Sequence, residues 1–141
     1  MERLESLAVR HLFYTELQII PPKDTGGGPQ GRRMIVGVSG GSFEGARLRG
    51  RVVAPSGDWM TLRPNGSMKL DVRLTLVTDD EAVIHMAYEG LVTRAQEDAK
   101  VRSAPLFETG DERYAWINDV QCVGIGEVEG STVRYQVYEL L

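Results

Sequence analysis

The residues most able to do chemistry are polar side chains placed where the sequence pattern predicts apolar neighbours. Asp58 follows Ser56-Gly57 and shares the face of a predicted strand with Met60 and Leu62. Among such neighbours desolvation would raise the pKa of the carboxyl group, and Asp58 could then act as a general acid or base. Alternatively, Asp58 accepts hydrogen bonds from the amides of the preceding turn.

Asn118 is a second polar exception, since period-two alternation places it on one face with aromatic and apolar residues. That face carries Tyr114, Trp116, Asn118, Val120 and Cys122. A buried amide must be hydrogen-bonded. Asn118 therefore either orients the carbonyl group of a ligand or ties down a neighbouring loop.

Arg102 and Glu108 flank the segment Ala104-Pro105-Leu106-Phe107 and share a face with Ala104 and Leu106. If this face points inward, the two residues form a charged pair in a pocket. If it points outward, they are surface charges, which is the commoner case for charged side chains.

A third group combines acidic, basic and aromatic side chains on one predicted polar face: Trp59, Asp71, Arg73, His85 and Glu89. A cation beside a tryptophan can bind an anionic aromatic ligand. The simpler interpretation is the solvated face of a sheet.

Other kinds of site lack support. The two histidines, His11 and His85, lie on different predicted strands without metal-ligand spacing around them. The sequence has no nucleophile elbow and no phosphate-binding loop. Cys122, the single cysteine, is best explained as a small core residue. We therefore expect neither a metal site nor a cofactor.

The elements that must position these residues are strands. Sixteen glycines and many period-two stretches are typical of β-structure. The one candidate for helix is a turn or two over residues 94–100. The pattern predicts strands over residues 9–20, 34–39, 43–54, 58–63, 67–78, 82–93, 100–108, 114–127 and 132–140. Breaks fall at Pro21-Pro22, Gly26-Gly27-Gly28-Pro29, Gly40-Gly41, Ser56-Gly57, Asn65-Gly66, Asp79-Asp80 and Glu129-Gly130.

The turn Pro64-Asn65-Gly66 decides which charges share a face with Asp58. Proline favours a three-residue loop with a left-handed glycine, which pairs Met60 with Leu70 and Asp58 with Val72. Only this register gives one buriable face. That face carries Met60, Leu62, Met68, Leu70, Val72 and Leu74, and the other carries Trp59, Thr61, Arg63, Lys69, Asp71 and Arg73.

The next connection, residues 78–81, follows the same logic. A three-residue loop pairs Leu74 with Met86 and Val72 with Tyr88, so the apolar face continues. Glu81 is a poor residue for the left-handed position of this loop.

Many strands with short connections predict an all-β fold, a single-domain antiparallel β-barrel over residues 1–141 with little helix. The net charge of −4 argues against a nucleic-acid partner. No apolar run approaches membrane-spanning length, and the N-terminus lacks the core of a signal peptide. A single cysteine fits a reducing compartment, so we expect a cytoplasmic protein.

Several short motifs together resemble a known family. They are Gly31-Arg32-Arg33, Gly40-Gly41-Ser42-Phe43-Glu44-Gly45, Asp58-Trp59, Arg63, Gly66, Leu70-Asp71, Arg73, Thr78-Asp79-Asp80, Ala104-Pro105, Phe107-Glu108-Thr109-Gly110 and Tyr114-Ala115-Trp116-Ile117-Asn118. This combination, which covers nearly the whole chain, resembles the bacterial and fungal family called domain of unknown function 3237, or uncharacterised protein family 0311.

The resemblance implies a small all-β barrel, often oligomeric, with no general function assigned. The chain departs from the family pattern at Glu81, where glycine is usual, and in a short segment between Gly90 and Arg102. The pattern includes Asp58, Trp59, Asp71, Arg73, Glu108 and Asn118 without assigning their roles.

Taken together, the sequence predicts a barrel with a mainly apolar pocket for a small organic ligand. Its lining would come from Met60, Leu62, Met68, Met86, Tyr88 and Trp116. The first hypothesis is a cofactor-independent enzyme that acts on a small aromatic or polyketide-like substrate. The reaction would be a proton-transfer isomerisation, a cyclisation or an elimination. Asp58 would be the acid or base, with Glu108 as second choice.

In this hypothesis Asn118, with Tyr88 or Arg102, would polarise a carbonyl or hold an oxyanion. The alternatives are a non-catalytic carrier or sensor that uses the same pocket, and a module that self-associates through Trp59 and Arg73. We expect a homo-oligomer as well as a small-molecule ligand.

Overall fold

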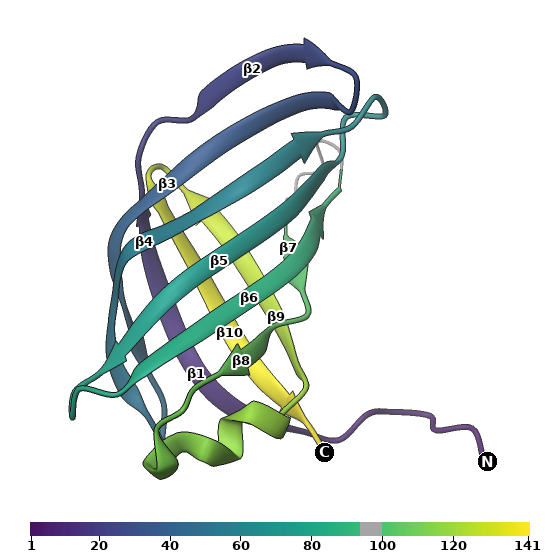
Figure 1. The fold of residues 1–141 in the computed structure, drawn as a ribbon. Coiled ribbons are helices and arrows are strands. Elements are labelled where there is room, and N and C mark those ends of the chain that lie inside the picture. The colour runs from purple at the N-terminus through teal and green to yellow at the C-terminus, as the bar shows by residue number, and fades with distance from the viewer. Residues whose placement is uncertain (94–99) are drawn as a thin grey trace.

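The computed structural model describes residues 1–93 and 100–141, which form a twisted barrel of strands with one short helix beneath it (Figure 1). The strands are β1 (Val9–Ile19), β2 (Lys23–Gly28), β3 (Gly31–Glu44), β4 (Arg49–Leu62), β5 (Met68–Thr78), β6 (Val83–Val92), β7 (Val101–Ser103), β8 (Leu106–Glu108), β9 (Cys122–Glu129) and β10 (Thr132–Leu140). The 3-10 helix η1 spans Glu112–Asp119.

Over the described residues, eight strands close into one antiparallel ring in the order β1-β10-β9-β7-β6-β5-β4-β3, and β3 pairs back with β1. β8 extends the wall beside β6, and β2 pairs with the first half of β3. The sequence prediction of an all-β antiparallel barrel with little helix is confirmed.

The wall forms because inward positions of the strands are apolar. On β5 the buried residues Leu70, Val72, Leu74 and Leu76 alternate with more exposed ones, so one face of the strand fills the barrel. Burial of this face is the main favourable contribution to folding.

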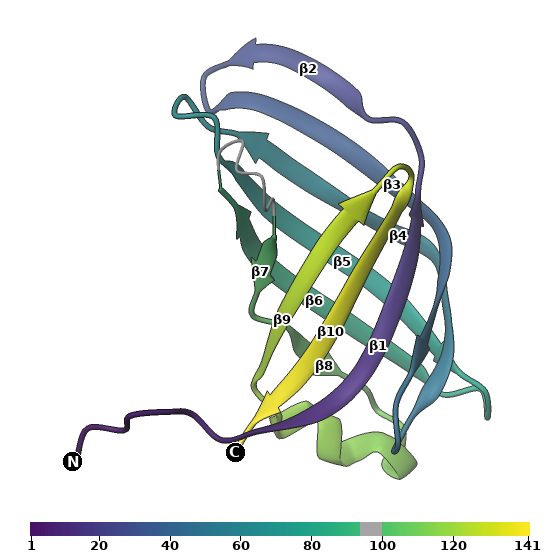
Figure 2. The same ribbon diagram turned by 180° about the vertical axis from the view of Figure 1, so that it is seen from behind.

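One end of the barrel is closed by aromatic packing and by η1. The ring of Phe13 contacts those of Phe43 and Phe107, with centroids 5.6 and 5.9 Å apart. Ile117 of η1 is fully buried in the same core. Figure 2 shows η1 under the wall that β1, β10 and β9 form. Any interior space must therefore lie nearer the opposite end.

The two turns that decide the register are confirmed. In the first, Gly66 has a φ of 86°, its N–H donates to the Arg63 carbonyl at 2.9 Å, and Asp58 pairs with Val72. In the second, Glu81 occupies the left-handed position with a φ of 70°, and Val72 pairs with Tyr88. Asp58, Val72 and Tyr88 therefore lie in one row across three strands.

Two predicted breaks are wrong because glycine does not always mark a turn: Gly40-Gly41 lies inside β3 and Ser56-Gly57 lies inside β4. The opposite error affects the predicted strand 43–54, which is interrupted at residues 45–48. A Cβ on Gly41 would lie 2.2 Å from the Glu16 carbonyl oxygen. This glycine permits the close approach of β1 to β3 rather than a turn. The predicted loop at residues 26–28 is likewise part of β2.

The boundaries of two predicted strands in the C-terminal half were also wrong. Residues 114–119, predicted as the start of a strand, belong to η1, because Asp111 caps this helix by accepting the Arg113 N–H at 3.0 Å. The predicted strand 100–108 divides into β7 and β8 around Ala104-Pro105. The helical turn predicted over residues 94–100 lies, except for Lys100, outside the described residues.

Candidate functional site

A cavity of about 200 Å³ lies inside the barrel. Its lining residues belong to the parts of the strands that lie away from η1 in Figure 1. Three of its lining side chains are polar: Asp58, Tyr88 and Tyr135. The others are aliphatic or carry a thioether: Leu17, Ile19, Val36, Val38, Met60, Met68, Leu70, Val72, Val92, Val101, Val128 and Val133. An apolar cavity with a few convergent polar groups is the usual form of a small-molecule site.

Asp58 enters this cavity from β4, between Val36 on β3 and Val72 on β5. Its Oδ1 accepts the backbone N–H of Asp71 at 2.9 Å. Burial raises the pKa of Asp58 to about 6, the Asp71 N–H opposes this rise, and the Asp71 charge adds to it. A carboxyl group with a pKa in this range has the proton affinity that a general acid or base needs near neutral pH.

Two phenols share the cavity with Asp58. Tyr88 on β6 and Tyr135 on β10 are each 5% exposed, and their rings meet edge to face with centroids 5.6 Å apart. Burial raises the pKa of both phenols. A hydrogen bond between the two hydroxyl groups raises the pKa of Tyr88 further and opposes the rise at Tyr135, and the charge of Asp58 adds to the rise at both. At neutral pH the two tyrosines are therefore a neutral, hydrogen-bonded pair with one O–H left to donate to a ligand.

Sequence reasoning named Tyr88 as a ligand-binding residue but missed Tyr135. The signal was available, because Val133, Tyr135 and Val137 alternate along the predicted strand 132–140. All three are buried, as the inward face of that strand requires.

The methionines named for ligand binding take different places. Met60 lines the cavity, as does Met68. Met86 is 2% exposed and belongs to the packed core rather than to the cavity lining.

Asn118 and Trp116 lie on η1, at the closed end of the barrel and away from the cavity. The Asn118 Oδ1 accepts the Thr109 N–H at 2.8 Å, and its Nδ2 donates to the Thr109 carbonyl at 3.0 Å. This is the loop-tying arrangement considered above. Trp116 lies under the guanidinium of Arg47, whose central carbon is 4.0 Å from the ring centroid.

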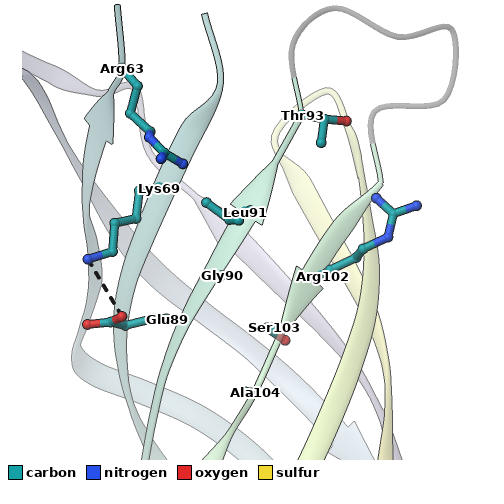
Figure 3. Close-up of a pocket in the computed structure, with 9 residues that line it drawn as sticks. All are labelled: Arg63, Lys69, Glu89, Gly90, Leu91, Thr93, Arg102, Ser103 and Ala104. Carbon is teal, nitrogen blue, oxygen red and sulfur yellow. Dashed lines mark ion pairs between the residues drawn. The ribbon is translucent and has the colours of Figure 1, made fainter. Parts of the chain in front are cut away.

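Glu108 and Arg102 are exposed and point outward, so they do not form a charged pair in the interior cavity. Glu108 on β8 is opposite His85 on β6 in the strand register, on the outer wall. Arg102 borders an outer hollow of about 670 Å³, shown in Figure 3, together with Arg63 and the ion pair of Lys69 with Glu89 at 3.6 Å. Solvent screens these exposed charges, so they interact with a ligand in this hollow much more weakly than the buried groups interact with one in the cavity.

Trp59 and Arg73 lie on the outer wall as well, with the guanidinium carbon 5.6 Å from the ring centroid. With His85 they border a second outer hollow, of about 200 Å³. Their predicted part in ligand binding stays a prediction.

Metal-binding side chains do not gather in the described part of the chain, where no three His, Cys, Asp or Glu residues lie close enough to hold an ion. Cys122 is buried, and burial raises the pKa of its thiol to about 12. The helix of residues 112–119 is too short to cross a bilayer, and no other described segment is a long apolar helix.

With this geometry in place, comparison with known proteins identifies the family. The model of a family described as protein of unknown function, DUF3237, matches residues 7–140. The chain belongs to this family. A DUF3237 relative from Rhodopseudomonas palustris, named UPF0311 protein, is 27% identical over 96% of this chain and 98% of its own length.

Solved structures share the DUF3237 fold. A β-barrel-like protein from Acinetobacter baumannii is 25% identical, with a TM-score of 0.88 and full coverage of both chains. An enzyme from Penicillium herquei has a TM-score of 0.79 at 21% identity, over 100% of this chain and 99% of its own. At that identity the likeness concerns the fold alone.

Proposed function

We propose that this DUF3237 barrel binds a small, mainly apolar organic molecule in its interior cavity and that Asp58 transfers a proton to or from the bound molecule. The observation that carries the proposal is the position of Asp58, a carboxyl group set among aliphatic side chains and facing two phenols. Burying a carboxyl group costs free energy, and such costs are concentrated at functional sites.

The size of the cavity limits the ligand. An engineered protein cavity of roughly 150 Å³ binds benzene. At about 200 Å³ this cavity fits one substituted ring or a branched chain of similar bulk. Substrates of that size agree with the small aromatic molecules expected from the sequence.

The chemistry that we propose rests on the position of Asp58 in the cavity, and its pKa of about 6 agrees with it. Near neutral pH the carboxylate is the main form, yet it accepts a proton readily, as a general acid–base requires. Isomerisation, cyclisation and elimination all need such a proton transfer. The Penicillium herquei protein, described as an enzyme, indicates that this fold can host catalysis, although fold alone does not fix function.

The second candidate is a carrier or sensor that binds the same ligand without changing it. It is favoured by the hydrogen bond from the Asp71 N–H to Asp58, which gives this carboxyl group a structural role as well.

One experiment separates the two. The protein is purified under native conditions, the retained small molecule is identified by mass spectrometry, and that molecule is then incubated with the wild type, Asp58→Asn and Glu89→Gln. Glu89 is the matched control because it follows Tyr88 on β6 but lies on the outer face, and its charge does not contribute to the raised pKa of Asp58. We expect turnover by the wild type and Glu89→Gln, and a loss of about a hundredfold or more in Asp58→Asn. A ligand that the wild type leaves unchanged would establish the carrier instead.

A further inference from the structure

The polar groups of the cavity are arranged around a space that one ring can fill. Asp58, Val72 and Tyr88 lie in one row on β4, β5 and β6, so Asp58 and Tyr88 are two strand spacings apart. Two spacings amount to about 10 Å along the wall. A bound molecule can therefore lie with one side towards the carboxyl group and another towards a phenol.

Tyr135 completes the phenol side of this space. It comes from β10, on the other side of β7 and β9 from Tyr88, and the two rings are in edge-to-face contact at 5.6 Å. All three side chains line the same cavity, and the charge of Asp58 adds to the raised pKa of both phenols.

The oxygen of a ligand has few places to go. Among the described lining side chains, only Tyr88 and Tyr135 carry an O–H, and Asp58 as a carboxylate only accepts hydrogen bonds. A carbonyl oxygen buried elsewhere in the cavity would be unpaired, at a substantial cost. A carbonyl ligand is thus oriented with its oxygen at the phenols and its carbon skeleton towards Asp58.

We infer that the reaction is proton abstraction from the carbon next to a carbonyl group, with Asp58 as the base and the hydrogen-bonded pair of Tyr88 and Tyr135 as the donor to the oxygen. This rests on the proposed function and names its substrate class, a monocyclic or similarly compact ketone or enone. Neutral donors aimed at an oxygen that becomes negative stabilise the transition state more than the ground state.

The step balances within the cavity. The Asp58 carboxylate takes the proton, and the electrons of the C–H bond form a carbon–carbon double bond. The carbonyl π electrons move to the oxygen, giving an enolate that accepts hydrogen bonds from the phenols. The protonated Asp58 then returns the proton to the same carbon or to a conjugated one, which completes an isomerisation without a co-reactant.

A stable anion can stand in for the enolate in the test. The probe is 4-nitrophenol, which forms a planar oxyanion of suitable size, and its neutral isostere 4-nitrotoluene lacks the oxygen. The protein is used as Asp58→Asn, which lacks the negative charge and imitates the state after proton abstraction. Affinities of both probes are measured by absorbance and calorimetry for this variant, the wild type, and versions that also carry Tyr88→Phe or Tyr135→Phe.

We expect the 4-nitrophenol anion to bind Asp58→Asn about tenfold more tightly than the wild type, because a like charge is removed. Adding Tyr88→Phe or Tyr135→Phe should weaken this binding about tenfold or more, since a hydrogen bond to an anion is lost. The affinity for 4-nitrotoluene should change less than about twofold, which also shows that the cavity is intact. Tyr138→Phe, on the outer side of the same strand β10, is the matched control and should change neither affinity.

The failures can be told apart. If both probes bind the wild type and the tyrosine substitutions leave the anion's affinity unchanged, the oxyanion role is overturned while the binding cavity stands. If neither probe binds any variant, the proposed function itself is overturned, and this inference with it.

Discussion

At the scale of single residues, Asp58 combines two opposing effects. Loss of water around its carboxyl group favours the protonated form, whereas the Asp71 N–H donates to Oδ1 at 2.9 Å and favours the ionised form. Desolvation is the larger effect, so the pKa settles at about 6. This balance makes Asp58 a usable base near neutral pH instead of an inert carboxylate.

The same balance predicts a pH-dependent stability. Unfolded Asp58 has a pKa of 3.8 and folded Asp58 one of about 6, so between these values the folded state binds more protons. Stability is therefore lost as the pH rises from about 4 through 6. Asp58→Asn should not lose stability over this pH range, because its amide does not titrate, and the amide keeps an oxygen that accepts the Asp71 N–H. The difference in the free energy of unfolding between Asp58→Asn and the wild type should grow by about 2 kcal/mol from pH 4 to pH 7. A shift of one pKa unit corresponds to about 1.4 kcal/mol, and we reduce the total because Asp58 is partly exposed.

Urea denaturation of both proteins at pH 4, 5, 6 and 7 measures this difference. A difference that stays constant across the series would mean that folding does not shift the pKa of Asp58, and the account of its burial would be wrong.

At the scale of elements, the turns set which residues face the cavity. The three-residue loops after β4 and β5 place Asp58, Val72 and Tyr88 in one row, and a register slip of one residue would move them to the outside. The second loop does this with a non-glycine residue, Glu81, at a φ of 70°. That conformation costs a residue with a Cβ about 1 kcal/mol.

Replacing Glu81 by glycine should therefore stabilise the protein. We expect Glu81→Gly to raise the free energy of unfolding by about 0.5–1 kcal/mol, since the relief of strain exceeds the added flexibility of the unfolded chain. The ion pair with Arg51 is exposed and, at 3.5 Å, contributes little. Glu81→Gln is the control, because it removes only the charge. Equal stability of the two variants in thermal denaturation would contradict a strained turn.

The same elements show how far the sequence predicts the site. The loop after β4 could be predicted because Pro64 and Gly66 have definite backbone preferences, and with it came the inward position of Asp58. Asn118 could not be placed, because the apolar residues Tyr114, Ile117 and Val120 also recur at every third position, which fits the 3-10 helix that Asp111 caps. Gly41 was misread because nothing local distinguishes a turn glycine from one under a crossing strand.

At the scale of the whole molecule, the cavity exists because the sheet closes on itself. Closure depends on the pairing of β1 with β3, which brings the Glu16 carbonyl against Gly41. Leu17 and Ile19 of β1 line the cavity next to Val36 and Val38 of β3. A change that separates these strands should open the cavity as well as lower the stability.

Gly41→Ala tests this dependence. Its Cβ would lie 2.2 Å from the Glu16 carbonyl oxygen, so the strands must move apart, and we expect a loss of about 3 kcal/mol in the free energy of unfolding. Gly40→Ala is the neighbouring control, since its nearest contact would be 3.9 Å away, and it should cost less than about 0.5 kcal/mol. Chemical denaturation compares them. Similar stability of the two variants would contradict the tight closure of β1 on β3.

The most direct test of the central claim is whether a compact organic molecule enters the cavity beside Asp58. The chain has five methionines, of which Met60 and Met68 line the cavity and Met1 lies in the exposed N-terminal segment. With carbon-13 in the methionine methyl groups, titration with 4-nitrotoluene is followed by NMR. We predict that the Met60 and Met68 signals shift along one saturation curve while the Met1 signal stays in place. Unchanged Met60 and Met68 signals at saturating probe would contradict the account.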